Sequence, residues 1–187
     1  MPADAMSARV SLHAGPGAGF DAPFEMLAAC HDRIERMLAL LERLADHLAE
    51  TGCDAEARQA AHDVMRYFDL AGPAHHEDEE RHVLAALAAT GDPALRALAD
   101  RLHDDHRAMA RRWPAVRAAL HEVAEGRWPA GDADVLAPWP AFVALQRAHL
   151  EAEERIAFPA ARRLVDADSE RAMGREMAQR RGAPPAD

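Results

Sequence analysis

The chain has 187 residues, which fits one domain with tails, and its 22 Lys and Arg against 32 Asp and Glu give a formal charge of −10. This balance, without a basic stripe interleaved with aromatic residues, argues against nucleic-acid binding. No apolar run approaches the roughly 18 residues that a membrane span needs, and residues 1–20 carry no signal-peptide pattern. We therefore expect a cytoplasmic protein that associates with neither nucleic acid nor a membrane.

The residue types favour helix over strand, because alanine, leucine, arginine and glutamate dominate and β-branched residues are few. Residues 1–21, rich in Ala, Gly and Pro, are predicted to form a flexible tail. One domain is predicted over 22–168, followed by a short helix and a disordered tail over 169–187. The predicted helices of the domain are 23–50, 54–89, 92–125 and 138–166.

Local signals set the predicted helix ends. Gly52 ends the first helix, and Asp92 followed by Pro93 is a strong start signal, because it places a carboxylate N-cap before a proline at the first helical position. The Gly-Pro pair at 72–73 is predicted to interrupt the second helix, and Pro114 to kink the third. Four long helices with short connections predict an all-α fold, an antiparallel up-down-up-down four-helix bundle with a short extra C-terminal helix.

Each of these helices carries an apolar stripe with alternating spacings of three and four residues, as expected for a face packed in a bundle. Polar residues interrupt all four stripes. They are His31, His75, Glu79, His106, His149 and Glu153. Each Glu follows a His by four positions and so lies on the same face. A carboxylate is rarely buried without a partner, and no Lys or Arg occupies the stripes, so we expect bound cations to compensate these residues.

Four imidazoles and two carboxylates are too many ligands for one tetrahedral zinc ion. They suit two six-coordinate ions, each bound by two His, bridged by both Glu and by one oxo or hydroxo group, with one position left open. Nitrogen and carboxylate ligands without thiolate favour iron or manganese. A ferritin-like site is not favoured, because that site uses Glu-x-x-His pairs and this chain has His-x-x-x-Glu.

Four segments resemble the four helices of the hemerythrin-like (HHE) family, in the same order. They read CHDRIER at 30–36, HHEDEERHVL at 75–84, LHDDH at 102–106 and HLEAEERIAFP at 149–159. The likeness covers about residues 22–181. It implies a centre of two iron ions with an oxo or hydroxo bridge, held by the six stripe residues, with manganese or zinc as possible substitutes.

Three departures from the family pattern bear on function. Ala85 replaces a proline that usually follows the second segment, which affects helix shape more than ligation. Ala110 stands where oxygen-carrying hemerythrins have a second His in the third helix. The last pair is His149 and Glu153, whereas the carriers have an Asp five residues after the His. The last two departures weaken the interpretation as a reversible oxygen carrier.

Several neighbours of the expected ligands are candidates for a supporting role. They are Tyr67, His76, His82 and His103. His76 lies about 100° around the helix from His75, and His103, three residues before His106, is the candidate for an additional ligand. The second Glu of each doublet, Glu80 and Glu154, is expected to be solvated or to partner a His.

Cys30 and Cys53 do not indicate a disulfide framework. They are expected as partly buried thiols, with a redox-sensitive thiol near the metal as the alternative. Without metal, we expect the pKa of Glu79 and of Glu153 to rise through burial.

The predicted function is binding or sensing of dioxygen, nitric oxide or peroxide at the open iron position, possible roles being the redox or nitrosative stress response or iron handling. A diiron enzyme with oxidase, peroxidase-like or nitric-oxide-reducing activity is the alternative. Binding is favoured because the sequence shows no substrate-pocket signature and no electron-donor domain, and no catalytic residue is identified. A metal-free or zinc-loaded structural bundle is a third possibility. A monomer and a homodimer both fit.

Overall fold

The computed structural model describes residues 19–128 and 136–183, and this part of the chain is all-helical. Its elements are α1 Pro23–Glu50, α2 Ala55–Asp78, η1 Glu79–Leu84, α3 Ala85–Ala88, α4 Pro93–Ala124, α5 Pro138–Ala152, η3 Glu153–Ala157, α6 Phe158–Leu164 and α7 Ala167–Arg180. The predicted N-terminal tail and final residues fall largely on 1–18 and 184–187, and most of the predicted loop at 126–134 falls on 129–135, all outside the described residues.

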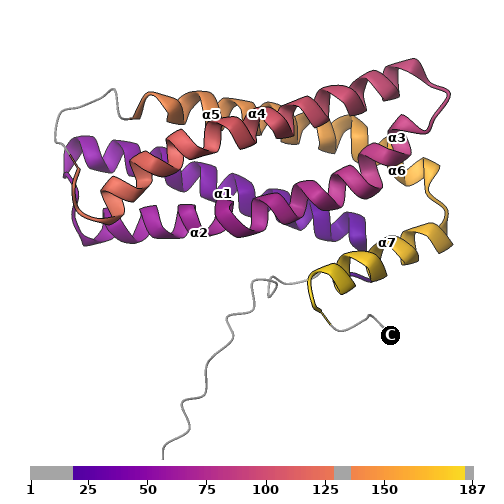
Figure 1. The fold of residues 1–187 in the computed structure, drawn as a ribbon, viewed down its shortest axis with the longest axis horizontal. Helices are drawn as coiled ribbons and strands as arrows, with labels where there is room; N and C mark the ends of the chain where they lie inside the picture. Colours follow the sequence, from indigo (N-terminus) through magenta and orange to yellow (C-terminus); the bar gives the residue numbers. More distant parts are fainter. Residues whose placement is uncertain (1–18, 129–135, 184–187) are drawn as a thin grey trace, which may run out of the picture.

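The helices form the predicted antiparallel bundle (Figure 1). α2, η1 and α3 make one continuous rod, α5, η3 and α6 make another, and α1 and α4 complete the four. α7 is the predicted extra helix and lies against the side of the bundle, beside the start of α1. No helix among the described residues is long and apolar enough to cross a membrane.

The predicted start signal at Asp92 acts as expected, because its carboxylate accepts a hydrogen bond from the backbone N–H of Ala94 at 2.8 Å. Asp54, predicted only as the first residue of the second helix, caps α2 in the same way by accepting from the backbone N–H of Ala57 at 2.9 Å. Pro93 is the first residue of α4, where a missing N–H costs nothing. At the end of α1, Gly52 has a φ of 88°, a backbone conformation that glycine adopts without strain.

The predicted interruption at 72–73 is wrong, because α2 runs through Pro73 without a break. A proline inside a helix removes one backbone hydrogen bond and costs about 3 kcal/mol. α2 recovers this cost by packing against α1 and α4, and buried residues flank the proline at Gly72 and His75. Pro114 likewise lies inside the continuous helix α4.

The irregular turns lie elsewhere, at the two π-helical segments η1 and η3. Each begins at the Glu of a His-x-x-x-Glu pair, Glu79 in one and Glu153 in the other. π-helical turns are rare and occur frequently at functional sites. No signal in the sequence predicted them.

The core is divided into two apolar clusters. The large cluster lies between the helices toward the α1–α2 and α4–α5 connections and includes Leu38, Leu41 and Phe142. The small cluster lies toward the opposite end and includes Leu27 and Leu87, together with Met173 and Met177 of α7. Each fully buried aliphatic side chain of this kind stabilises the fold by about 1.5–3 kcal/mol. The six polar stripe residues belong to neither cluster.

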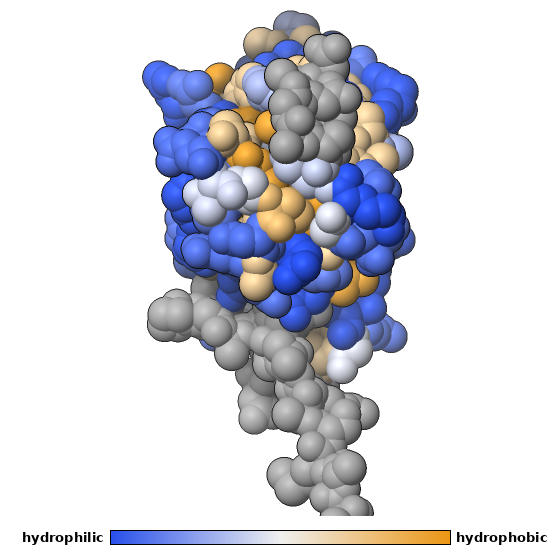
Figure 2. Space-filling model, turned by 90° about the vertical axis from the view of Figure 1, so that its left-hand side faces the viewer, coloured by the Kyte–Doolittle hydropathy of each residue, from blue (hydrophilic) through white to orange (hydrophobic). Residues whose placement is uncertain are grey.

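The end of the bundle that carries the α1–α2 and α4–α5 connections is shown in Figure 2. Hydrophilic residues dominate its flanks, and apolar residues show between them at the centre of this face. This is the pattern of amphipathic helices that turn their apolar stripes inward.

Candidate metal centre

Six polar side chains from all four rods meet between the two clusters. α1 supplies His31, α2 and η1 supply His75 and Glu79, α4 supplies His106, and α5 and η3 supply His149 and Glu153. Each of the six is at most 4% exposed. The structure therefore brings together all six residues that the sequence predicted as ligands.

Their ligating atoms form two sets that share both carboxylates. One set is His31, His75, Glu79 and Glu153, and the other is Glu79, His106, His149 and Glu153. Within each set the atoms lie within 4.8 Å of one another, close enough to surround one cation. Two adjacent cation positions with Glu79 and Glu153 between them fit this arrangement.

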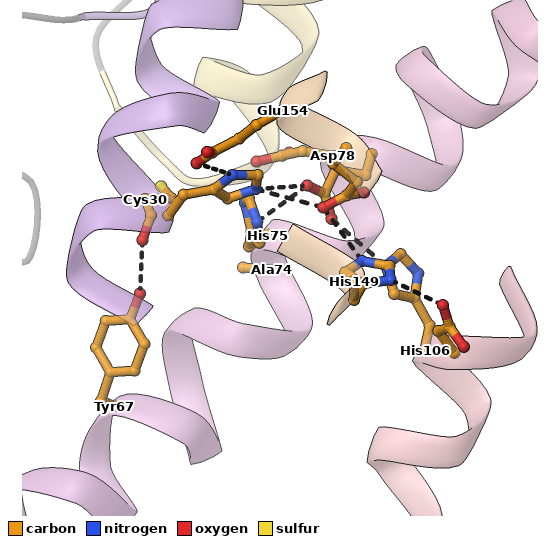
Figure 3. A network of polar contacts seen from close by, with 12 residues as sticks. Cys30, Tyr67, Ala74, His75, Asp78, His106, His149 and Glu154 are labelled. Atoms are coloured by element: carbon orange, nitrogen blue, oxygen red, sulfur yellow. Dashed lines mark hydrogen bonds and ion pairs between the residues drawn. The ribbon is translucent and has the colours of Figure 1, made fainter. Parts of the chain in front are cut away.

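The Nε2 atoms of the four histidines point inward, as Figure 3 shows for the pairs around His75 and His149. His75 Nε2 lies 3.0 Å from Glu79 Oε1, and His149 Nε2 lies 3.2 Å from Glu153 Oε2. His31 Nε2 lies 3.3 Å from Glu79 Oε1. His106 Nε2 lies 3.5 Å from Glu79 Oε2 and 3.0 Å from His149 Nε2.

Three of the four Nδ1 atoms point outward to a carboxylate. His106 Nδ1 is 2.9 Å from Glu80 and His31 Nδ1 is 3.1 Å from Glu154, so of the two expected alternatives, solvation or pairing with a His, both acids show the pairing. His149 Nδ1 is 3.5 Å from Asp105, which the sequence analysis missed. An acid on Nδ1 fixes the tautomer that turns the Nε2 lone pair inward, as is typical of metal-bound histidines.

His75 differs from the other three histidines. Its neighbour on the outer side is the thiol of Cys30. Burial raises the pKa of Cys30, but the proximity of His75 and the nearby charges of His75, Arg181 and Arg33 lower it by more, so the net shift is downward. The geometry gives His75 Nδ1 no hydrogen-bond partner among the described residues, so the thiol is a close neighbour and not an orienting acid. The structure thus places one cysteine beside the centre, as the alternative interpretation of Cys30 requires.

In the absence of metal, the pKa values of His31, His75 and His106 are raised, which favours protonated rings beside the buried acids. Burial alone lowers the pKa of His31, but hydrogen bonds to Glu153 and Glu79 raise it to about 9. Burial raises the pKa of Glu79, yet the charge of His75 and hydrogen bonds from His106, His31 and His75 hold it well below its usual value. The expected rise for Glu79 is therefore wrong, because its histidine neighbours outweigh its burial.

The donor set fits a pair of metal ions. The Oε2 atom of Glu79 and both carboxylate oxygens of Glu153 are buried without a hydrogen-bond partner among the described residues. Such atoms are costly unless an ion or water satisfies them. Four imidazoles and two carboxylates with no thiolate in the sets match the preferences of iron or manganese.

The four expected supporting residues lie in different places. His76 stacks on the His106 ring, with centroids 4.0 Å apart and planes at 13°. His103 Nδ1 is 4.0 Å from Glu80, the partner of His106. The Tyr67 hydroxyl donates a long hydrogen bond of 3.4 Å to the Cys30 carbonyl, two helical turns from His75 along α2.

His82 lies away from the centre, with its Nε2 atom 2.7 Å from Glu176 of α7. In a regular α-helix it would lie one turn beyond Glu79 on the same stripe. The wider π-helical turn of η1 displaces it around the helix axis. A structural feature that the sequence did not signal thus explains why His82 faces α7.

Asp78, the residue before Glu79, was missed by the sequence analysis. It is fully buried, and both of its oxygens bind guanidinium groups at the end of α7, one of Arg180 at 2.7 Å and one of Arg181. Burial raises the pKa of Asp78, an effect that the two arginines oppose. This contact ties α7 to the turn that carries Glu79.

Comparison with known proteins agrees with the geometry. The profile of the hemerythrin HHE cation binding domain matches residues 22–161, a span that contains all six central residues. An uncharacterized protein of Haemophilus influenzae is 28% identical over 164 residues, which cover 88% of this chain and 92% of that protein. Since the domain profile matches well over half of the chain, this protein belongs to the hemerythrin HHE cation-binding family.

Proposed function

We propose that the protein holds two iron ions between Glu79 and Glu153 and uses them to bind or sense a small molecule. The observation that supports this most directly is the pair of four-residue sets that share both carboxylates. Two histidines, two bridging carboxylate oxygens and a bridging oxo or hydroxo group would give each ion five ligands. The sixth position would remain for dioxygen, nitric oxide or a peroxide.

The iron pair, when bound, would supply redox-active cations to which such a molecule could coordinate. The chain contributes the surroundings. Glu80, Asp105 and Glu154 orient three of the imidazoles, and the two apolar clusters on either side keep bulk water away from the centre. The six side chains are buried, so only a small molecule could reach them without a rearrangement of the helices.

His76 adds a neutral surface beside His106. Burial, and then the charge of His106, lower the pKa of His76 well below its usual value. A neutral ring stacked at 4.0 Å can restrain the orientation of His106 without adding charge. This restraint would act on a ligand that already has Glu80 on its other nitrogen.

The test is to measure iron content and the optical spectrum of the oxidised protein, and then to expose the reduced protein to oxygen and to nitric oxide. We expect iron near two per chain and a spectral change with at least one of the two gases. His106→Ala should reduce the iron content by at least half. His62→Ala, which changes an exposed histidine of α2, should leave it unchanged.

Iron content unaffected by His106→Ala would remove that residue from the ligand set, and a protein without stoichiometric metal would refute the proposal. Sustained turnover of peroxide or nitric oxide with a reductant would identify an enzyme instead of a binding module.

A further inference from the structure

A pocket of about 580 Å³ lies on the outer side of the bundle between α1, α2 and the C-terminal end of α7. α1 lines it with Cys30, Arg33 and Met37, spaced three and four residues apart on one helix face. α7 contributes Arg180, and Arg181 directly follows that helix. The volume falls within the range of about 300–1,000 Å³ that is typical of sites for small organic ligands.

One part of this α1–α2–α7 pocket is apolar. Met37 and Leu40 of α1 face Leu70, Ala71 and Ala74 of α2 across it. Leu70 is 56% exposed, the most exposed large apolar side chain in the described part of the chain. An exposed leucine at the edge of a concave apolar surface indicates a site that can bind the apolar part of a ligand.

The other part of the pocket is basic. Four guanidinium groups line it, those of Arg33, Arg66, Arg180 and Arg181, and the only acid in the lining is Asp63, 3.3 Å from Arg66. Acids behind the lining, Asp78 and Glu176, also pair with Arg180 and Arg181, so the excess positive charge of the pocket lies mainly at Arg33. This charge has the opposite sign to that of the whole chain, which carries −10. A basic lining on an acidic protein favours an anionic occupant.

Arg181 lies at the boundary between the pocket and the bundle. Its side chain is 10% exposed, and its NH2 group binds Asp78 and the Ala74 carbonyl on the bundle side. Its Nε atom is buried and has no hydrogen-bond partner among the described residues. This nitrogen is covered by the surrounding atoms, so a carboxylate in the pocket would pair with the more exposed guanidinium groups of Arg33 and Arg66, since guanidinium and carboxylate groups pair in well-defined geometries.

We propose that the α1–α2–α7 pocket binds an amphipathic carboxylate, with its acid group among the arginines and its apolar body against Met37, Leu40 and Leu70. The pocket is separate from the six buried central residues, so this binding does not require iron. It lies close to them, however, because Cys30 and Ala74 directly precede His31 and His75.

The experiment is calorimetric titration of the purified protein with decanoate, and with decanol as a neutral analogue of the same length. We expect saturable binding of one decanoate per chain and at least tenfold weaker binding of decanol. The double variant Arg33→Gln, Arg66→Gln should weaken decanoate binding at least tenfold, because charge-assisted hydrogen bonds are lost. Arg107→Gln is the matched control, because Arg107 is an exposed arginine of α4 paired with Asp104.

Leu70→Asp provides an independent variant. The side chain is more than half exposed, so the helix should remain folded by circular dichroism. We expect decanoate binding to be abolished, since the apolar contact is lost and a negative charge is introduced. The titrations should give the same affinity within a factor of three for iron-loaded and metal-free protein, which separates this proposal from the proposed function.

Absence of saturable decanoate binding by the unmodified protein would overturn the inference. So would equal affinities for decanoate and decanol, or an affinity unaffected by the Arg33, Arg66 double variant. Concentration-dependent dimerisation in sedimentation, abolished by Leu70→Asp and unaffected by decanoate, would show that a second copy of the chain covers the pocket, which also contradicts a carboxylate site.

Discussion

The two halves of the candidate centre use the same residue types in different surroundings. In the α4–α5 half, both histidines place Nδ1 on a carboxylate, Glu80 for His106 and Asp105 for His149. In the α1–α2 half, His31 has Glu154, but Nδ1 of His75 has no hydrogen-bond partner among the described residues and lies near the Cys30 thiol. A carboxylate partner makes an imidazole a stronger donor, so the two cation positions are expected to be inequivalent although their ligands match.

The halves also differ in what lies beyond them. The ring of His76 covers His106 in the α4–α5 half, and Phe158 stacks on His31 in the other, with centroids 4.9 Å apart. The α1–α2 half borders the pocket and α7, through Cys30 and the Asp78 contact with Arg180 and Arg181. A change in the position of α7 should therefore affect the His31–His75 half more than the His106–His149 half.

The strongest way to break the comparison is to remove a residue that both halves share. Glu79→Gln keeps the shape of the side chain but loses the charge that faces three histidines. We expect iron to be lost from both positions, whereas His149→Ala should mainly empty the α4–α5 position. Metal analysis of the two variants provides the measurement. Equal iron contents in both would mean that Glu79 does not serve both positions.

The second way is to release α7. Arg180→Gln with Arg181→Gln leaves Asp78 buried without its cations, which costs about 3–5 kcal/mol of unfolding free energy. Denaturant unfolding measures this loss. Arg171→Gln, on the exposed side of the same helix, should change stability by less than about 0.5 kcal/mol. A double variant as stable as the control would show that the contact does not hold α7.

Titration of the metal-free protein sharpens the comparison. Because the pKa of His31 is raised to about 9 in the folded state, its stabilising contribution is complete below about pH 6.5 and is lost as the pH rises through 9. We expect metal-free protein to lose about 2–3 kcal/mol between pH 6.5 and 9.5. In the proposed iron-loaded protein the imidazoles would bind the metal as neutral rings, so this loss should be absent. Denaturation midpoints of the metal-free and iron-loaded protein at pH 6.5 and 9.5 measure the difference. A metal-free protein with the same stability at both pH values would contradict the raised pKa of His31.

The smallest expected effects concern the two acids that contact histidine Nδ1 atoms, Glu80 and Glu154. Glu80→Ala should weaken metal binding about 10–100-fold, as expected when the partner of a metal-bound histidine is removed. Glu154→Ala should have a smaller effect, because the Glu154 side chain is 54% exposed and its contact with His31 is screened. Competition with a chelator measures both affinities. A larger loss of metal affinity for Glu154→Ala than for Glu80→Ala would contradict the expectation that Glu80 orients its histidine more strongly than Glu154 does.

Features that depend on neighbours along the chain could be predicted from the sequence. The helix starts at Asp54 and Asp92 were predictable, since capping depends on neighbours along the chain. The six central residues were predictable because helical periodicity places residues three or four apart on one face. The partners Glu80 and Glu154 followed from their position next to an inward Glu.

Contacts between distant residues were not predictable in this way. The Asp105–His149 pair spans 44 residues and the Asp78–Arg180 pair spans 102. The continuous helix through Pro73, the π-helical turns and the outward position of His82 also depend on packing between rods. The neighbouring residues in the sequence do not predict these features, because each depends on whether burial against another helix outweighs the free-energy cost of an irregular backbone.

The sequence by itself therefore determined the helices, their inward faces and the identity of the six polar residues, because propensity, capping and periodicity act within a few turns. The tertiary structure decided which acid orients which histidine, how α7 is held to Asp78, and that the α1–α2–α7 pocket exists beside Cys30. These features need side chains from separate helices at hydrogen-bond distance, and that distance is set only when the bundle is packed.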